Sequence, residues 1–133
     1  MIILFLNKEN VLVFIEFKNG RMDNSQKFAI RKKIYDSIII LTDILNVGVS
    51  KLRDNMEYIL VYNEFVNENE KDVLEKKRYT VQHSASYDYF AKSVSKLAKT
   101  EYVCFGVKKF ENYCFRKVHT YTKEEFASYL QCN

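Results

Sequence analysis

Strand-like and helix-like patterns alternate over the first 63 residues, and this order most restricts the fold. Residues 1–6 and 11–19 are apolar, strand-like runs, and the four polar residues 7–10 between them suit a hairpin. From residue 23 to about residue 45, apolar residues recur every three to four positions, as on one face of a helix. Residues 56–63 then form an apolar run that is typical of an interior strand. These patterns predict a sheet with one β-α-β crossover.

The second half of the chain adds further elements of both kinds. It carries a helical pattern over residues 84–100, strand-like runs at 101–108 and 113–121, and a capping box at 122–125 that opens a short last helix. Residues 38–45 are nearly apolar all round, so we expect the first helix to be buried there on more than one side. The predicted fold class is α/β or α+β, with a mixed sheet of about five strands, an N-terminal hairpin and two or three helices packed on it.

The length of 133 residues fits a single domain. Within it we distinguish a core over residues 1–63, an acidic and then basic connecting segment over 64–83, and a last part over 84–133. No apolar run approaches the roughly 20 residues that cross a bilayer, and no basic residue precedes the apolar start. We therefore expect a cytoplasmic protein without a membrane partner, whose three cysteines are reduced: Cys104, Cys114 and Cys132.

Charge is unevenly distributed along the chain, although the net charge is only +4. Residues 57–75 are acidic, and the segments on both sides are basic and rich in tyrosine and phenylalanine. Basic side chains interleaved with aromatic ones are compatible with a nucleic-acid-binding surface, because phosphates attract them. An ordinary solvated surface is the alternative interpretation. The candidate nucleic-acid-binding residues are Lys18, Arg21, Arg31, Lys32 and Lys33.

The second strand carries an acidic and a basic side chain that could act together in catalysis. Alternation places Phe14, Glu16 and Lys18 on the same face of the second strand. A carboxylate beside an ammonium group suits phosphodiester hydrolysis, in which the carboxylate binds Mg²⁺ and the lysine positions or deprotonates the attacking water. The alternative is a strand-end ion pair without catalytic meaning.

The segment around this pair resembles a known family. A hairpin whose second strand ends in Glu16-Phe17-Lys18, followed by the helix RKKIYDSIIILTDIL and an interior strand, resembles the PD-(D/E)xK nuclease superfamily. It looks most like small bacterial and mobile-element members with a similar FIEFKNG segment. The resemblance covers about residues 1–63. It implies Mg²⁺-dependent cleavage of DNA or RNA, with Glu16 as a metal ligand and Lys18 as the catalytic lysine.

The chain departs from this family at one position. The family pattern includes an aspartate on the preceding strand, whereas residues 1–8 contain no acidic residue. If the turn pairs Asn7 with Asn10, Glu16 lies opposite Met1, so the aspartate would fall at or before the first residue. Asp36 or Asp43, on the following helix, is the candidate second metal ligand, and Asp36 lies nearer the helix start. An active Mg²⁺-dependent endonuclease and a degenerate relative therefore both remain open.

The degenerate interpretation leads to a function of a different class. A phage or mobile element could use the fold as a non-catalytic binding protein that inhibits a host defence nuclease, as anti-CRISPR proteins do. Glu64, Glu68 and Glu70 would then mimic nucleic-acid charge toward a nucleic-acid-binding protein complex. The apolar edge at residues 1–6 also predicts pairing between two copies as a homodimer.

Overall fold

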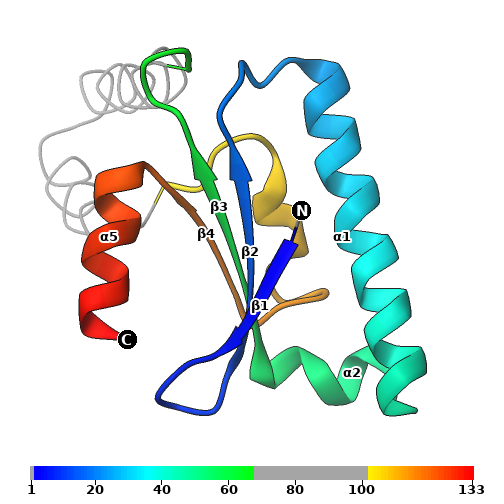
Figure 1. Cartoon of the computed structure of the whole chain (residues 1–133). Helices are drawn as coiled ribbons and strands as arrows, with labels where there is room; N and C mark the ends of the chain where they lie inside the picture. The colour runs from blue at the N-terminus through cyan, green and yellow to red at the C-terminus, as the bar shows by residue number, and fades with distance from the viewer. Residues whose placement is uncertain (1, 68–101) are drawn as a thin grey trace, which may run out of the picture. The chain divides into compact units, whose positions relative to one another are not determined.

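The computed structural model describes residues 2–67 and 102–133, which form a mixed four-stranded sheet between helices (Figure 1). The predicted α+β class is confirmed, with four strands in the described residues rather than about five. The predicted helix at residues 84–100 lies outside this part. In chain order the elements are β1 (Ile2–Leu6), β2 (Leu12–Lys18), α1 (Asn24–Leu45), α2 (Val49–Leu52), the 3-10 helix η1 (Arg53–Asn55), β3 (Met56–Tyr62), the 3-10 helix η2 (Val107–Phe110), β4 (Lys117–Tyr121) and α5 (Lys123–Cys132).

The strands lie in the order β1-β2-β3-β4. β1 runs antiparallel to β2, whereas the β2–β3 and β3–β4 pairs are parallel. Helix α1 connects β2 to the parallel β3 and forms the predicted β-α-β unit. All seven residues of β3 are buried, as its continuous apolar sequence predicts for an interior strand.

The β1–β2 turn sets a register that differs by one residue from the expected one. The side chain of Asn7 accepts hydrogen bonds from the backbone N–H groups of Glu9 and Val11, at 2.9 and 3.0 Å. Asn10 adopts a left-handed conformation with φ of 60°. The loop therefore has one residue more than expected, which makes it a three-residue hairpin loop of a common type. Glu16 consequently lies opposite Ile2 and not opposite Met1.

Helix α1 begins and ends at residues that favour helix caps. Asp23 caps the N-terminus by accepting from the N–H of Gln26 at 2.8 Å, and Asn46 ends the helix in a left-handed conformation. A stripe of three isoleucines is buried: Ile30, Ile34 and Ile38.

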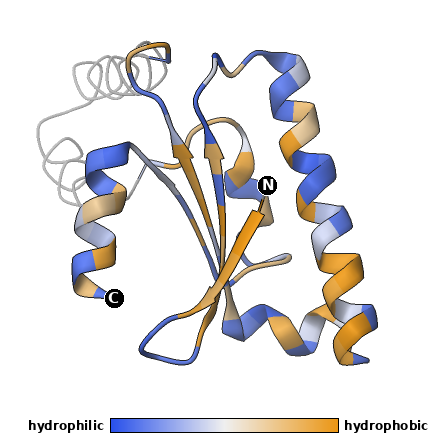
Figure 2. Ribbon diagram, viewed as in Figure 1, coloured by the Kyte–Doolittle hydropathy of each residue, from blue (hydrophilic) through white to orange (hydrophobic). Residues whose placement is uncertain are grey.

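The expectation that the C-terminal part of α1 is buried on more than one side is wrong for the residues that the structure describes. Ile39, Ile40, Ile44 and Leu45 are exposed, by 64%, 59%, 72% and 48%. Figure 2 shows the apolar colouring of this end of the helix. One helix face meets the sheet, and no part of chain segments 2–67 and 102–133 buries the opposite face.

Each face of the sheet has its own apolar core. On one face, Val13, Ile15, Ile59 and Val61 form a cluster with Phe126 of α5. On the other face, α1 supplies the isoleucine stripe and the chain around η2 supplies aromatic rings. Phe115 lies edge-on to Phe14 at 5.4 Å and tilted to Tyr58 at 5.5 Å.

Of the two strand-like runs at 101–108 and 113–121, only part of the second is a strand among the residues that the structure describes. Residues 102–104 have no regular structure, Val107–Phe110 is a 3-10 helix, and only Lys117–Tyr121 is a strand, which pairs with β3. Phe105, Gly106 and Asn112 have positive φ angles, so the chain turns where a strand would continue. The apolar residues of this segment cover the sheet face instead of alternating along a strand, since Phe110 and Phe115 are fully buried. The last helix has the predicted capping box between Thr122 and Glu125.

Candidate functional site

Glu16 is the buried centre of a polar cluster between β2, β3 and α1, whose Lys33 side chain is 41% exposed. Its side chain is completely inaccessible to solvent. One carboxylate oxygen, Oε1, accepts a hydrogen bond from Lys33 Nζ at 3.0 Å and lies 3.6 Å from Lys18 Nζ. The other oxygen, Oε2, accepts from the Tyr58 hydroxyl at 3.1 Å. We call these four residues, Glu16, Lys18, Lys33 and Tyr58, the Glu16 cluster.

The sheet and helix geometry explains how these side chains meet. Alternation along β2 puts Glu16 and Lys18 on the face toward α1, as predicted. Tyr58 shares that face because its position in β3 pairs with Phe14, two residues before Glu16. Lys33 reaches the carboxylate from α1. Sequence reasoning proposed Lys33 only as a nucleic-acid contact and missed Tyr58, which lies 42 residues from Glu16.

Burial and the neighbouring Glu16 shift the pKa values of two members of the cluster, Lys33 and Tyr58. The hydrogen bond to Glu16 raises the pKa of Lys33, outweighing the partial burial that lowers it. Burial raises the pKa of Tyr58 well above its ordinary value, and the negative charge of Glu16 adds to this. Tyr58 therefore remains a neutral hydrogen-bond donor, and two ammonium groups compensate the one buried negative charge.

The donor set of this cluster does not fit Mg²⁺. Magnesium is usually bound by one or two carboxylates, and water molecules and phosphate oxygens fill its other coordination positions. The carboxylate oxygens must therefore be free to face the metal. Both oxygens of Glu16 are already engaged by protein groups, and two ammonium groups would repel a divalent cation. The residue opposite Glu16 on β1 is the apolar Ile2. Across the described ranges, no three His, Cys, Asp or Glu side chains are grouped so that they could hold a metal ion.

Asp36 is not placed beside Glu16 as a second ligand. Its carboxylate Oδ2 lies 3.0 Å from Lys32 Nζ, one turn earlier on α1, and both side chains are more than half exposed. This is an ordinary surface pair between positions i and i+4 of a helix.

The structure separates the predicted nucleic-acid-binding residues into two groups. Lys18 and Lys33 belong to the Glu16 cluster. Arg31 and Lys32 line a different hollow of about 330 Å³ at α1 and η2. Arg21 is exposed in the connection between β2 and α1. The run Arg31-Lys32-Lys33 is thus contiguous in sequence but points to two sites.

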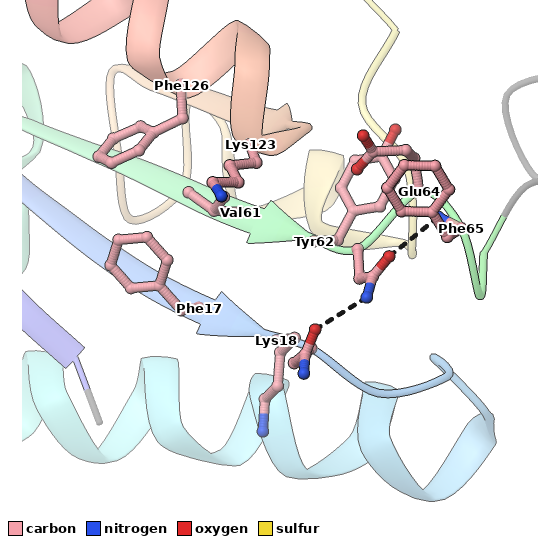
Figure 3. Close-up of a pocket in the computed structure, with 10 residues that line it drawn as sticks. Phe17, Lys18, Val61, Tyr62, Glu64, Phe65, Lys123 and Phe126 are labelled. Carbon is pink, nitrogen blue, oxygen red and sulfur yellow. Dashed lines mark hydrogen bonds between the residues drawn. The ribbon is translucent and has the colours of Figure 1, made fainter.

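A pocket of about 440 Å³ lies at the carboxyl ends of β2 and β3 (Figure 3). Neighbouring parallel strands commonly end at such a crevice, but sequence reasoning did not identify it. Phe17 and Phe126 both line it and contact each other edge to face, with ring centroids 5.5 Å apart, whereas the Lys18 side chain is directed toward α1. The lining residues are Phe17, Lys18, Asn19, Val61, Tyr62, Asn63, Glu64, Phe65, Lys123 and Phe126.

Glu64 lines this pocket, whereas Glu68 and Glu70 lie outside the described residues. The proposed mimicry of nucleic-acid charge by these three side chains therefore stays a prediction.

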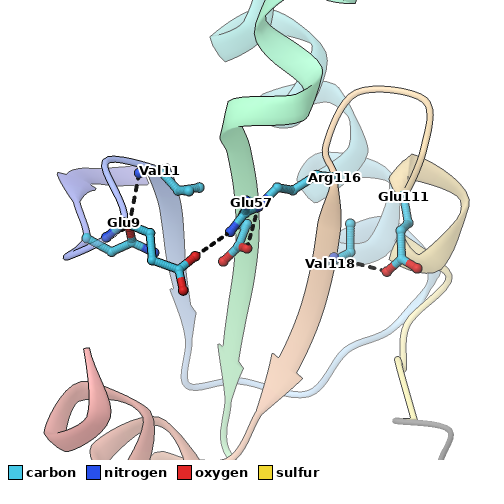
Figure 4. A network of polar contacts seen from close by, with 7 residues as sticks. Glu9, Val11, Glu57, Glu111, Arg116 and Val118 are labelled. Carbon is cyan, nitrogen blue, oxygen red and sulfur yellow. Dashed lines mark hydrogen bonds and ion pairs between the residues drawn. The ribbon is translucent and has the colours of Figure 1, made fainter.

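A second polar network lies at the opposite, amino-terminal end of β3 (Figure 4). Arg116 Nε donates to Glu57 Oε1 at 2.8 Å, and its Nη2 donates to Glu9 Oε2 at 3.1 Å. Glu57 is nearly buried, while the Glu9 side chain is 71% exposed. This network links the β1–β2 turn, β3 and the start of β4, and local sequence gives no signal for it.

Comparisons with family models, with curated proteins and with solved structures found no match for this chain. Within residues 2–67 and 102–133, no helix is both long and apolar enough to cross a membrane.

Proposed function

We propose that this protein is a nucleic-acid-binding protein with a nuclease-like core that does not cleave its ligand. The observation that carries the proposal is the occupation of both Glu16 oxygens by Lys33, Lys18 and Tyr58. At a magnesium-dependent nuclease site these oxygens would face the metal. Here they stabilise the sheet against α1.

The order of elements supports the nuclease-like part of the proposal. The resemblance to the PD-(D/E)xK superfamily implies a hairpin, a helix and an interior strand, with the acidic and basic pair on the second hairpin strand. The antiparallel β1–β2 pair, helix α1 and the parallel β3 follow this order. Glu16 and Lys18 occupy β2, on the face toward the helix.

The binding part of the proposal rests on charge. The first half of α1 contains Lys27, Arg31, Lys32 and Lys33 and no acidic residue. Lys33 pairs with the buried Glu16 and Lys32 with the exposed Asp36, whereas Arg31 lines the hollow at α1 and η2, where it attracts phosphate groups.

A cleavage assay tests the absence of catalysis. The full chain would be incubated with supercoiled plasmid, single-stranded DNA and RNA in Mg²⁺ and separately in Mn²⁺. We expect no cleavage above the buffer control. Cleavage that is lost in both Glu16→Gln and Lys18→Ala, but kept in Asp36→Asn, would contradict the proposal and restore the magnesium-dependent nuclease.

Binding is tested separately with fluorescently labelled oligonucleotides. We expect fluorescence anisotropy to show binding that weakens as the salt concentration rises, because phosphate contacts release counterions. No binding to DNA or RNA even at low salt would refute the proposed partner class.

A further inference from the structure

An aromatic and basic stripe runs along the exposed side of helix α1. Phe28, Arg31, Lys32 and Tyr35 follow the spacing i, i+3, i+4 and i+7, which puts them on one helix face. Together with Lys109 from η2 they line the hollow of about 330 Å³. Phe28 is 64% exposed, and Tyr35 is 41% exposed. Such spacing usually marks a buried apolar stripe, but here the rings remain accessible between cations.

Part of this hollow is held in place by the core. The Tyr35 ring packs edge-on against Phe110, with ring centroids 5.2 Å apart, and Phe110 is fully buried. Lys109 Nζ lies 5.2 Å from the centre of the same Phe110 ring. The buried Phe110 thus positions both the Tyr35 ring and the Lys109 ammonium group, which come from distant parts of the chain.

The charge of the hollow selects an anionic ligand. Its three charged lining residues, Arg31, Lys32 and Lys109, are all basic. Asp36 pairs with Lys32, but this pair is exposed and therefore screened by solvent. The pair does not involve Arg31 or Lys109.

We infer that this hollow binds a short stretch of single-stranded nucleic acid. This inference rests on the proposed function, because it names the surface and the form of the ligand for the same partner class. A base stacks on the exposed face of Phe28, and phosphates contact Arg31, Lys32 and Lys109. Stacking on aromatic rings combined with basic side chains along the backbone is how proteins bind single strands without reading sequence.

The dimensions of the stripe agree with a small footprint. Tyr35 lies seven positions after Phe28 on the helix, a rise of roughly 10 Å. Three stacked nucleotides at roughly 3.4 Å each cover the same distance. In a duplex the base faces are covered by neighbouring base pairs, so the rings would have no stacking partner. We therefore expect a preference for single strands.

The test measures binding of the full chain to a labelled 12-nucleotide oligo(dT), to a duplex of equal length and to an acidic peptide. Phe28→Ala should weaken binding to the single strand roughly 5- to 100-fold. Arg31→Gln and Lys109→Gln should each weaken it and lower the salt dependence by about one released counterion. The matched controls are Tyr113→Ala, an exposed ring elsewhere, and Lys51→Gln, an exposed cation elsewhere, and both should bind as the unmodified chain does.

The outcomes separate this inference from the proposed function. If the unmodified chain binds the single strand but Phe28→Ala and Arg31→Gln bind equally well, the hollow is the wrong surface and the proposed function stands. Tighter binding of the duplex overturns the single-strand preference. Tighter binding of the acidic peptide, with the same losses in the variants, makes the hollow a protein-docking site. If no nucleic acid binds at all, the proposed function itself fails.

A folding control accompanies these measurements. Because Phe28 is exposed, Phe28→Ala should unfold at the same temperature as the unmodified chain. Unchanged thermal unfolding would show that a loss of binding does not result from a loss of folding.

Discussion

Glu16 shows how strongly the surroundings of a side chain decide its role. The pair Glu16 and Lys18 fits a catalytic carboxylate and lysine when only the sequence of β2 is considered. In the folded chain a second lysine, Lys33, approaches the same oxygen at 3.0 Å, closer than Lys18 at 3.6 Å. A buried carboxylate with two cations and a phenol around it stabilises the fold as long as all partners remain.

Replacing Glu16 tests this structural role. We expect Glu16→Gln to lower the free energy of unfolding by about 2 kcal/mol, because charge-assisted hydrogen bonds are lost and two ammonium groups lose their counterion. Urea denaturation without added metal measures the change. Asp36→Asn, at an exposed pair, should change the stability by less than about 0.5 kcal/mol. An increase in stability for Glu16→Gln would instead indicate a strained carboxylate that awaits a metal.

The same cluster predicts a loss of stability in alkaline solution. The pKa values of Lys33 and Tyr58 are both raised in the folded chain. A group with a raised pKa contributes its full stabilisation below its unfolded pKa, and this contribution is lost as the pH rises through the folded value. Stability should therefore fall from about pH 10 upward, where unfolded tyrosine and lysine release protons.

Thermal unfolding between pH 8 and 11 measures this alkaline fall. Tyr58→Phe should be less stable at neutral pH, because Glu16 loses a donor, but its stability should fall less steeply above pH 10. Tyr113→Phe, at an exposed tyrosine, should follow the unmodified curve. Equal slopes for Tyr58→Phe and the unmodified chain would show that Tyr58 does not contribute.

At the scale of elements, Arg116 connects the start of β4 to β3 and to the β1–β2 turn. Its two partners differ in burial, which provides a matched comparison. Arg116→Met leaves Glu57 nearly buried without its cation and should cost about 2 kcal/mol of stability. Glu9→Gln removes the exposed partner and should cost less than about 0.5 kcal/mol. Denaturation midpoints of the two variants measure both, and equal losses would contradict this division.

Elements defined by local pattern could be predicted from the sequence. The period-2 runs, the α1 stripe with its caps, and the capping box of α5 all depend on neighbours within a few residues. The segment from residue 101 to 116 could not, because its short aromatic runs fit a strand as well as a folded loop. Positive φ at Phe105 has no local signal, because a bulky aromatic residue rarely adopts that conformation, whereas asparagine, as at Asn112, adopts it more readily. The one-residue change in hairpin register likewise depends on the conformation of Asn10.

The candidate site was predictable only along β2. Alternation placed Glu16 beside Lys18, but the partners that decide the chemistry come from α1 and β3. Their approach depends on the angle at which α1 crosses the sheet, and residue spacing in the sequence does not predict that angle. For the same reason Lys109 could not be assigned to the hollow beside Arg31, since the two lie 78 positions apart in the chain.

At the scale of the whole molecule, apolar side chains on β1 remain open to solvent. Leu4 and Leu6 are 48% and 60% exposed, and β1 pairs with β2 alone among the strands that the structure describes. An apolar edge strand is prone to pair with another edge. We therefore expect concentration-dependent self-association through β1.

Sedimentation velocity over a range of protein concentrations tests this association. Leu4→Lys should shift the chain toward the monomer, because a charge on an edge strand opposes pairing. Leu130→Lys adds the same charge at an exposed leucine of α5 and should leave the association unchanged. A monomer at every concentration of the unmodified chain would refute the expected contact.

The central position of β3 has a consequence for chain continuity. β3 is bordered by β2 on one side and by β4 on the other, and β4 arrives from residues more than fifty positions later. A polypeptide that stops at Asn67 therefore lacks both a strand neighbour for Met56–Tyr62 and the Phe126 ring that covers Ile59 and Val61. A second polypeptide that spans residues 102–133 carries both missing parts. Two such fragments, mixed as separate molecules, should reconstitute one folded unit that neither forms alone.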